Sequence, residues 1–142
     1  MIIRKAVVTD ARKIEHMVKD RDNWLNHIGL KWQNFWVVEE EQTLIACGQL
    51  RPWENIFELS SLAVLSDYRE KGIGTYLIRS LIEQANTVVY LSCGSHLESF
   101  YRRAGFKRIL WSNLPSLLKL EFSLSWIIAT ARRKQLIFMR HE

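Results

Sequence analysis

The stretch from residue 62 to residue 85 constrains the fold of this chain more than any other part of its sequence. It opens with the short apolar run Leu62-Ala63-Val64, crosses a polar loop and reaches Gly72 and Gly74. Apolar residues then recur at four-residue steps, at Ile73, Leu77, Leu81 and Ala85. Such spacing places them on one face of a helix, so the pattern predicts a buried strand, a glycine turn and an amphipathic helix in succession.

The start of this predicted helix has the properties of an anion-binding site. The first backbone N–H groups of a helix have no acceptor within the helix, and they carry partial positive charge. Gly72 and Gly74 would let the backbone approach an oxygen atom closely, and Arg69 and Lys71 add positive charge. The turn also fits an ordinary strand–turn–helix unit. It does not match the Walker pattern, because no Gly-Lys-Ser/Thr ends it, and it does not match Gly-x-Gly-x-x-Gly, because Leu77 stands at the third glycine position.

Short apolar runs predict further strands, at residues 2–7, 35–40, 43–51, 56–65, 88–93, 107–110 and 136–140. Thr9-Asp10 and Ser95 are placed to cap two further helices, the second of which ends at Gly105. We expect Pro52 to end the strand before it, since proline has no N–H to donate. The predicted fold class is therefore α/β of the α+β type, with a central mixed, mostly antiparallel sheet flanked by helices.

The segment from residue 115 to residue 133 has two competing patterns. One set of residues alternates as in a strand: Leu118, Leu120, Phe122, Leu124 and Trp126. A second set fits a helical stripe: Leu117, Leu120, Leu124, Ile127, Ile128 and Ala131. Length and the basic ending favour a helix over roughly the second half. Packing against the sheet is the first expectation for the apolar residues, and a pocket lid or a dimer surface are the alternatives.

Composition and charge exclude several classes of protein. The 142 residues, 48% of them hydrophobic, suit one domain, which we expect to span residues 1–142. No linker, repeat, signal-peptide pattern or membrane-length apolar run is evident, and two cysteines make no disulfide framework. We therefore expect a cytoplasmic protein without membrane contact. The net charge of +5 is better explained by solvated surface charge, with some attraction to a phosphorylated cofactor, than by nucleic-acid binding, and four scattered histidines predict no metal site.

Two motifs resemble those of the GNAT family of N-acetyltransferases. Residues 69–74 match the family's Arg/Gln-x-x-Gly-x-Gly/Ala loop in full, and residues 100–106 resemble its Phe-Tyr-x-x-x-Gly-Phe signature. They occur in the family's order and at a typical separation. The resemblance is sharp from about Phe57 to Arg108, depends on element order alone before Asn55, and fades after Leu110. It implies a GNAT-like fold, acetyl-CoA as co-substrate and transfer of its acetyl group to an amine.

The resemblance also implies roles for individual residues. Backbone amides of the loop would hold the CoA pyrophosphate, while the preceding strand would pair with the pantetheine arm and polarise the thioester carbonyl. Tyr101 matches the family tyrosine that protonates the departing CoA thiolate, and the alternative is a tyrosine that only packs its ring. Where many members have an asparagine, this chain has Gly94-Ser95-His96, so one usual cofactor contact is missing. The implied cofactor-binding residues are Leu62, Ala63, Val64, Arg69, Glu70, Lys71, Gly72, Ile73, Gly74 and Thr75.

An acceptor ammonium must lose a proton before it attacks, and two carboxylates are candidate bases. Glu58 lies upstream in the strand of Leu62, where some family members have a catalytic glutamate. By period-two alternation it shares a face with Ser60, Leu62 and Val64, unless a bulge intervenes. Glu54, in the preceding turn, is the weaker candidate. The alternative for both is a surface carboxylate.

The remaining candidates are less specific. His96 lies near the predicted site, and Cys93 is expected to pack in a buried strand, because no ordered Cys–His–Asp set accompanies it. Four tryptophans fall in regions that often wall the acceptor pocket in the family, although core packing explains them better: Trp24, Trp32, Trp36 and Trp53.

The function predicted from these observations is transfer of an acetyl group from acetyl-CoA to an unidentified amine, on a small molecule, peptide or protein. Two other classes remain open. One is a non-catalytic module of the same fold that senses acetyl-CoA or binds a partner, and the other is a basic protein that binds RNA or DNA. A homodimer also remains open.

Overall fold

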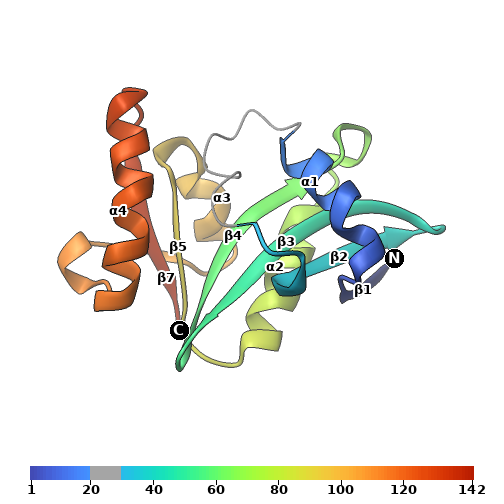
Figure 1. Ribbon diagram of the computed structural model, residues 1–142, viewed down its shortest axis with the longest axis horizontal. Helices are drawn as coiled ribbons and strands as arrows, with labels where there is room; N and C mark the ends of the chain where they lie inside the picture. The colour runs from blue at the N-terminus through green and yellow to red at the C-terminus, as the bar shows by residue number, and fades with distance from the viewer. Residues whose placement is uncertain (20–29) are drawn as a thin grey trace.

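The computed structural model describes residues 1–19 and 30–142. Within these ranges, seven strands form one sheet in the order β1-β2-β3-β4-β5-β7-β6 (Figure 1). Neighbouring strands run antiparallel except β4 and β5, which are parallel. The predicted mixed, mostly antiparallel sheet is thereby confirmed. The strands are β1 (Ile2–Lys5), β2 (Phe35–Glu40), β3 (Thr43–Trp53), β4 (Ile56–Val64), β5 (Val89–Gly94), β6 (Lys107–Ile109) and β7 (Leu136–His141).

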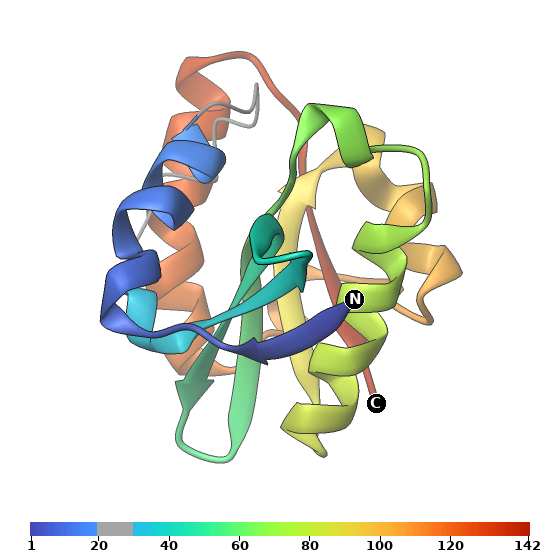
Figure 2. The ribbon, with the colours of Figure 1, turned by 90° about the vertical axis from the view of Figure 1, so that its right-hand side faces the viewer.

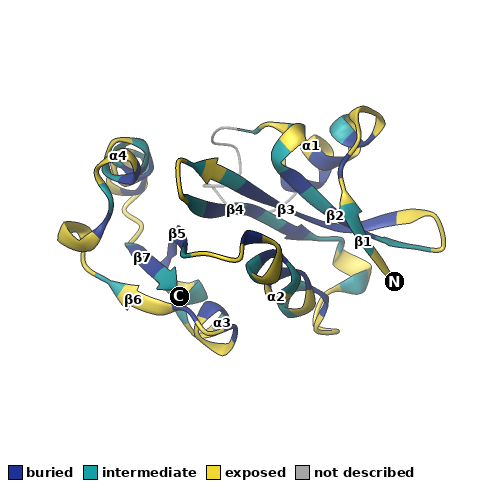
Figure 3. Ribbon diagram, turned by 90° about the horizontal axis from the view of Figure 1, so that it is seen from below, coloured by how far each residue is buried: buried dark blue, intermediate teal, exposed yellow. Residues whose placement is uncertain are grey.

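Four α-helices flank the sheet in the described part of the chain, two on each face. Helices α2 and α3 cover one face, while α1 and α4 cover the other (Figures 2 and 3). The helices are α1 (Ala11–Lys19), α2 (Ile73–Ala85), α3 (Glu98–Arg103) and α4 (Ser116–Ala131). Short 3-10 helices precede several of these elements, at η1 (Val8–Asp10), η2 (Trp32–Asn34), η3 (Ser66–Tyr68), η4 (Ser95–Leu97) and η5 (Trp111–Asn113).

The larger core lies between the sheet and α2. This helix buries the apolar face that its spacing predicted: Ile73, Leu77, Ile78, Leu81 and Ala85. Each large aliphatic side chain removed from water contributes about 1.5–3 kcal/mol. A Cβ added at Gly48 of β3 would lie 3.1 Å from a Leu62 methyl and 3.2 Å from a Leu81 methyl. The close contact of α2 with β3 and β4 fixes where the helix begins relative to the end of β4.

The opposite face carries two smaller cores. Helix α1 buries Ile14, Met17 and Val18 over β2 and β3. Helix α4 buries Leu118 and Phe122 over β5 and β7, where the Phe122 ring stacks on that of Phe138 with centroids 5.8 Å apart. Helix α1 thus covers the side of this face formed by β3 and β4, and α4 covers the side formed by β5 and β7 (Figure 3).

Helix α4 differs in two ways from its prediction. It is helical over its whole length, Ser116–Ala131, and not only over the second half. The residues it buries are Leu118, Phe122, Ser125 and Ala129. Most of the predicted helical stripe instead faces outwards, with Leu120 79% and Ile127 58% exposed. The expected packing of the apolar segment against the sheet is therefore made by Leu118 and Phe122, and not by the predicted stripe.

Two local predictions are also wrong. Strand β3 continues through Pro52 to Trp53, because β2 pairs with β3 only as far as Gln49 and a strand with a partner on one side tolerates proline. Ser95 does not cap α3, since it begins η4, and α3 starts at Glu98 without a side-chain cap. The predicted end of α3 at Gly105 is confirmed by its φ of 98°.

Candidate functional site

The site is organised by the divergence of β4 and β5. These parallel strands pair only at Phe57–Val89 and Glu58–Tyr90. Three residues after Glu58, β4 carries a bulge at Ser61, whose φ of 54° is uncommon for a residue with a side chain. Beyond Glu58 the described residues contain no further β4–β5 pairs, so the C-terminal half of β4 borders an opening in the sheet.

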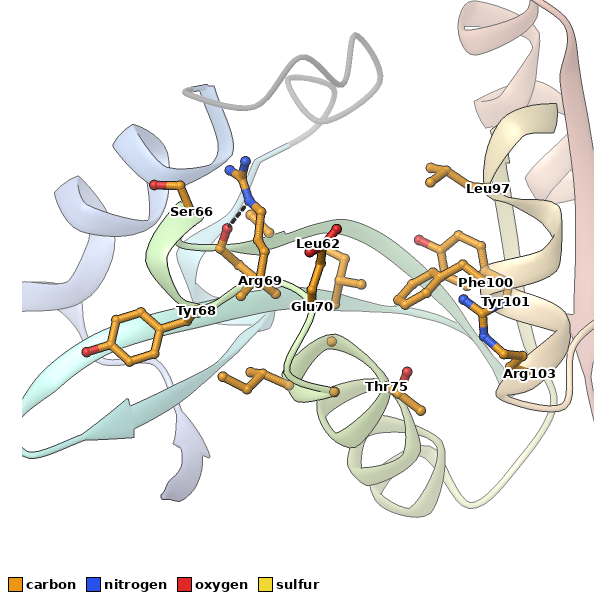
Figure 4. A pocket seen from close by; sticks show the side chains of 15 residues that line it. Leu62, Ser66, Tyr68, Arg69, Glu70, Thr75, Leu97, Phe100, Tyr101 and Arg103 are labelled. Atoms are coloured by element: carbon orange, nitrogen blue, oxygen red, sulfur yellow. Dashed lines mark hydrogen bonds between the residues drawn. The ribbon is translucent and has the colours of Figure 1, made fainter.

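A cavity of about 720 Å³ occupies this opening, between β4, the start of α2 and α3 (Figure 4). Lys71 is the one predicted cofactor-binding residue outside its lining, and its ammonium lies 5.6 Å from the centre of the Tyr68 ring. Residues from both sequence motifs therefore meet around one cavity, although they are distant in the sequence. The predicted cofactor-binding residues that line it are Leu62, Ala63, Val64, Arg69, Glu70, Gly72, Ile73, Gly74 and Thr75.

The N-terminus of α2 lies at one side of this cavity. The helix begins directly after Gly72, whose φ of 79° is a left-handed conformation. A Cβ at this position would meet no atom within 4 Å. Glycine is therefore required here by the backbone conformation and not by a lack of space. The Tyr76 N–H donates to the Gly72 carbonyl at 3.0 Å. The N–H groups that precede Tyr76 in α2 have no acceptor within the helix, and they create a positive potential at the cavity.

Gly74 is required for space. A Cβ there would lie 3.2 Å from Phe100 Cζ on α3 and 3.8 Å from Val64 Cγ2 on β4. A side chain at Gly74 would narrow the space between α2 and α3. The absence of a side chain at Gly74 therefore keeps room for a ligand that reaches the first turn of α2.

Two arginines line the cavity from opposite sides (Figure 4). Arg69 follows β4, and its Nε donates to the Val64 carbonyl at 2.9 Å. Arg103 comes from α3 and was not singled out by the sequence, although it lies two positions after Tyr101 in the second motif. Glu70 is the one acidic residue among the lining residues, and it holds a left-handed φ of 63°. Together with the α2 amides, the two guanidinium groups favour an anionic ligand.

Tyr101 of α3 also lines the cavity, as the sequence suggested for this residue. It is buried, and its ring makes edge contacts with Phe100 and Phe106, at centroid distances of 5.1 and 5.9 Å. Its hydroxyl is directed into the cavity, towards β4 (Figure 4). Phe106 is a core residue, as expected, whereas Phe100 lines the cavity.

Glu58 lies on the other face of the sheet from Leu62 and Val64. The prediction that these side chains share a face held only without a bulge, and the bulge at Ser61 reverses the alternation of β4 between Glu58 and Leu62. Glu58 faces α4, where the Arg51 guanidinium lies 3.3 Å from Glu58 and 2.6 Å from Glu121. The Trp53 Nε1–H donates to Glu58 Oε1 at 3.0 Å.

These surroundings perturb the titration of Glu58. The carboxyl group is buried, and this burial raises its pKa from 4.5 to about 7. Arg51 and the Trp53 hydrogen bond oppose the increase, whereas the negative charge of Glu121 adds to it. A carboxyl group with a pKa near 7 can both accept and release a proton at neutral pH, which suits a general base.

A second cavity, of about 640 Å³, lies beside this cluster. It is lined by residues around η2 and the end of β3: Lys31, Gln33, Asn34, Arg51, Pro52 and Trp53. Arg51 and Trp53 thus contact Glu58 and also line the cavity. Neither Lys31 nor Arg51 was singled out by the sequence, because no local pattern marks residues that meet only in the fold.

The other candidates separate clearly. Glu54 is exposed in the β3–β4 turn, and burial raises the pKa of the Cys93 thiol to about 12, which disfavours a thiolate nucleophile. Trp36 packs against the larger core under α2, and Trp32 packs against the smaller core under α1. Trp24 lies outside the described residues. The His96 ring lies against Gly94, where an added Cβ would be 2.7 Å from its Nδ1.

The described part of the chain, residues 1–19 and 30–142, contains no group of three or more His, Cys, Asp or Glu side chains arranged to hold a metal ion. None of its helices is long and apolar enough to cross a membrane.

Solved structures with this fold include acetyltransferases and proteins in complex with coenzyme A. N-acetylglutamate synthase from Neisseria gonorrhoeae, complexed with coenzyme A and N-acetyl-glutamate, is 17% identical, with a TM-score of 0.77 over 99% of this chain and 34% of that protein. Rv2747 from Mycobacterium tuberculosis, in complex with CoA and NLQ, is 20% identical, with a TM-score of 0.79 over 99% and 98%. The ribosomal-protein-alanine N-acetyltransferase of Brucella melitensis is 20% identical, with a TM-score of 0.68 over 99% and 98%. The class of protein is therefore that of the acetyltransferase fold.

The family follows from the sequence itself. The family model described as acetyltransferase (GNAT) domain matches residues 31–108, which is more than half of the chain. The chain belongs to the GNAT family, as its two motifs indicated. Among curated proteins, none matches the sequence significantly.

Proposed function

We propose that this chain is an acetyl-CoA-dependent N-acetyltransferase that acetylates an amine by direct transfer in a ternary complex. The observation that supports this most strongly is the cavity of about 720 Å³, because residues of both family motifs surround it at the start of α2. The same fold occurs in proteins crystallised with coenzyme A, which favours this cofactor.

The residues around the cavity fit coenzyme A. The unpaired amides of the first turn of α2 suit a pyrophosphate, and Gly74 leaves the space that a bound chain needs beside Phe100. Arg69 and Arg103 supply positive charge on both sides. The backbone of β4 beyond the bulge borders the same opening, where an extended pantetheine arm can add as a strand.

The proposed chemistry divides between the two faces of the sheet. Acetyl-CoA supplies an activated carbonyl carbon, and a backbone N–H near the β4 bulge polarises the carbonyl. Glu58 takes the proton from the acceptor ammonium, directly or through a water molecule. The amine then forms the new C–N bond as the C–S bond breaks, and Tyr101 donates its proton to the departing thiolate. The second proton that the nitrogen loses as the amide forms then restores the Tyr101 hydroxyl. Positioning of the two substrates supplies much of the remaining rate enhancement.

The test combines binding and turnover. Calorimetric titration with coenzyme A measures the first, and release of free thiol from acetyl-CoA, screened against grouped amines, measures the second. We expect both, and we expect Glu58→Gln to lower turnover at least 100-fold while the matched variant Glu54→Gln leaves it unchanged. Binding of coenzyme A without thiol release from any group would instead favour a non-catalytic module. Failure to bind coenzyme A would refute the proposal.

A further inference from the structure

The second cavity lies on the far side of the sheet from the α2 N-terminus, beside the side chains that hold Glu58. Its connection to Glu58 passes through two side chains, because Arg51 and Trp53 line the cavity and contact the Glu58 carboxylate at 3.3 and 3.0 Å. A molecule in this cavity therefore lies within one side chain of the candidate base. The cofactor cavity shares no lining residue with it.

The lining of this cavity is rich in hydrogen-bond donors. Lys31 and Arg51 are cations, Gln33 and Asn34 carry amide groups, and Trp53 presents an aromatic ring. None of the described lining residues is acidic. A polycationic amine would meet like charge here, whereas a carboxylate would find charged and neutral donors together.

The two cations are not equivalent. The Arg51 guanidinium already contacts Glu58 and Glu121, and it lies 5.3 Å from the centre of the Trp53 ring. Much of its charge is therefore compensated within the protein. Lys31 has an exposed side chain, and its backbone N–H is held by Gln49 Oε1 at 3.1 Å. Lys31 is consequently the cation that remains to bind a ligand anion.

The position of Lys31 relative to the bulge is also fixed. Gln49 accepts from the Lys31 backbone and donates from Nε2 to Ser60 Oγ at 3.1 Å, next to Ser61. This chain of two hydrogen bonds ties η2 to β4 at the point where the strand bends. The Lys31 backbone is therefore held close to the strand that borders the cofactor opening.

We propose that the acceptor amine also carries a carboxylate, and that it binds in this second cavity with the carboxylate at Lys31 and the amine at Glu58. Free amino acids and related zwitterions have this chemistry. The inference rests on the proposed acetyltransferase function and specifies its substrate class. A polyamine is the clearest excluded alternative.

Matched acceptors test the proposal. Free L-amino acids, the same amino acids as C-terminal amides, and spermidine are compared by acetyl-CoA-dependent thiol release. We expect kcat/KM for the best acid to exceed that for its amide about ten-fold or more, because the amide lacks the charge that Lys31 binds. Equal or greater activity with the amides or with spermidine would overturn the inference.

A variant pair separates binding from a structural effect. Lys31→Gln should raise KM for the preferred acid about ten-fold and leave kcat and KM for acetyl-CoA unchanged. Lys134→Gln, which removes an equal charge at an exposed position after α4, should change none of these. An unchanged KM in Lys31→Gln would contradict the assignment.

Direct binding measurements test the inference if no acceptor supports turnover. The same acids and amides are titrated by calorimetry into the protein saturated with coenzyme A. Binding of an acid that is lost in Lys31→Gln supports the cavity assignment, even though absent turnover counts against the enzymatic function. Binding of no acid, or equal binding of acids and amides, overturns the inference while leaving cofactor binding unaffected.

Discussion

Replacement of the buried Glu58 by glutamine should make the protein more stable at alkaline pH. In the fold, burial raises the pKa of Glu58 to about 7, against an ordinary value of 4.5. Between these values the folded protein holds the proton more tightly than the unfolded chain does. The free energy of unfolding must therefore fall as pH rises from 4.5 to 7, and this group adds no further loss above that range.

The magnitude follows from the two pKa values. One pKa unit corresponds to 1.36 kcal/mol, so ionisation of Glu58 in the fold costs about 3 kcal/mol of stability at pH 8. Glutamine cannot ionise, and its amide oxygen can still accept from the Trp53 Nε1–H. Arg51 retains its ion pair with Glu121 at 2.6 Å. The variant should consequently lose the pH-dependent cost and keep most of the local contacts.

Urea unfolding followed by circular dichroism, at pH 5 and at pH 8, measures the effect. The stability of Glu58→Gln relative to the parent should rise by about 2.5 kcal/mol between the two pH values, because part of the cost of ionisation is already present at pH 5. Other titrating groups, including Asp10, cancel in this difference. For Glu54→Gln, at an exposed turn, the difference in stability from the parent should be the same at pH 5 and at pH 8. If the curves of Glu58→Gln and the parent run parallel, Glu58 is not a buried carboxyl with a raised pKa.

Three further outcomes follow from the site. Gly72→Val should abolish coenzyme A binding in calorimetry, and normal binding would exclude the α2 turn as the pyrophosphate site. The substitution should also lower the free energy of unfolding by about 1–2 kcal/mol, because a β-branched residue resists a φ of 79°. Tyr101→Phe should reduce turnover at least ten-fold and leave acetyl-CoA binding unchanged, and Tyr76→Phe, at an exposed position, is the control. Full activity of Tyr101→Phe would show that Tyr101 is not the general acid. Glu121→Gln should move the acid limb of the pH–rate profile to lower pH, because the negative charge of Glu121 raises the pKa of Glu58. An unchanged acid limb, or a shift to higher pH, would contradict the coupling through Arg51.

The sequence predicted the parts of the site that are continuous in the chain. The four-residue spacing after Gly72 specified α2 and its buried face, and the glycine turn specified the left-handed start of that helix. Tyr101 was found through its motif and does line the cavity. These features depend on residues within one or two helical turns of one another, which is the distance over which sequence patterns are informative.

The parts that failed depend on irregular backbone or on distant residues. Nothing in the sequence marks Ser61 for a φ of 54°, yet this single residue moves Glu58 to the other face of the sheet. The contact of Arg51 with Glu121 joins residues 70 positions apart. Helix α4 was half missed because its apolar residues satisfy strand and helix periods equally, and its exposed stripe broke the rule that periodic apolar residues are buried.

The arrangement of the sheet also bears on how this protein can diversify. The cofactor cavity is encoded by one continuous stretch, residues 62–103, whereas the Glu58 cluster and second cavity draw on η2, the β3–β4 hairpin and α4. A gene copy that exchanged the segment between β6 and β7 would alter Glu121 and leave the residues around the first cavity unchanged. In the proposed function, such an exchange would change the surroundings of the candidate base while the site proposed for the acyl donor stays the same.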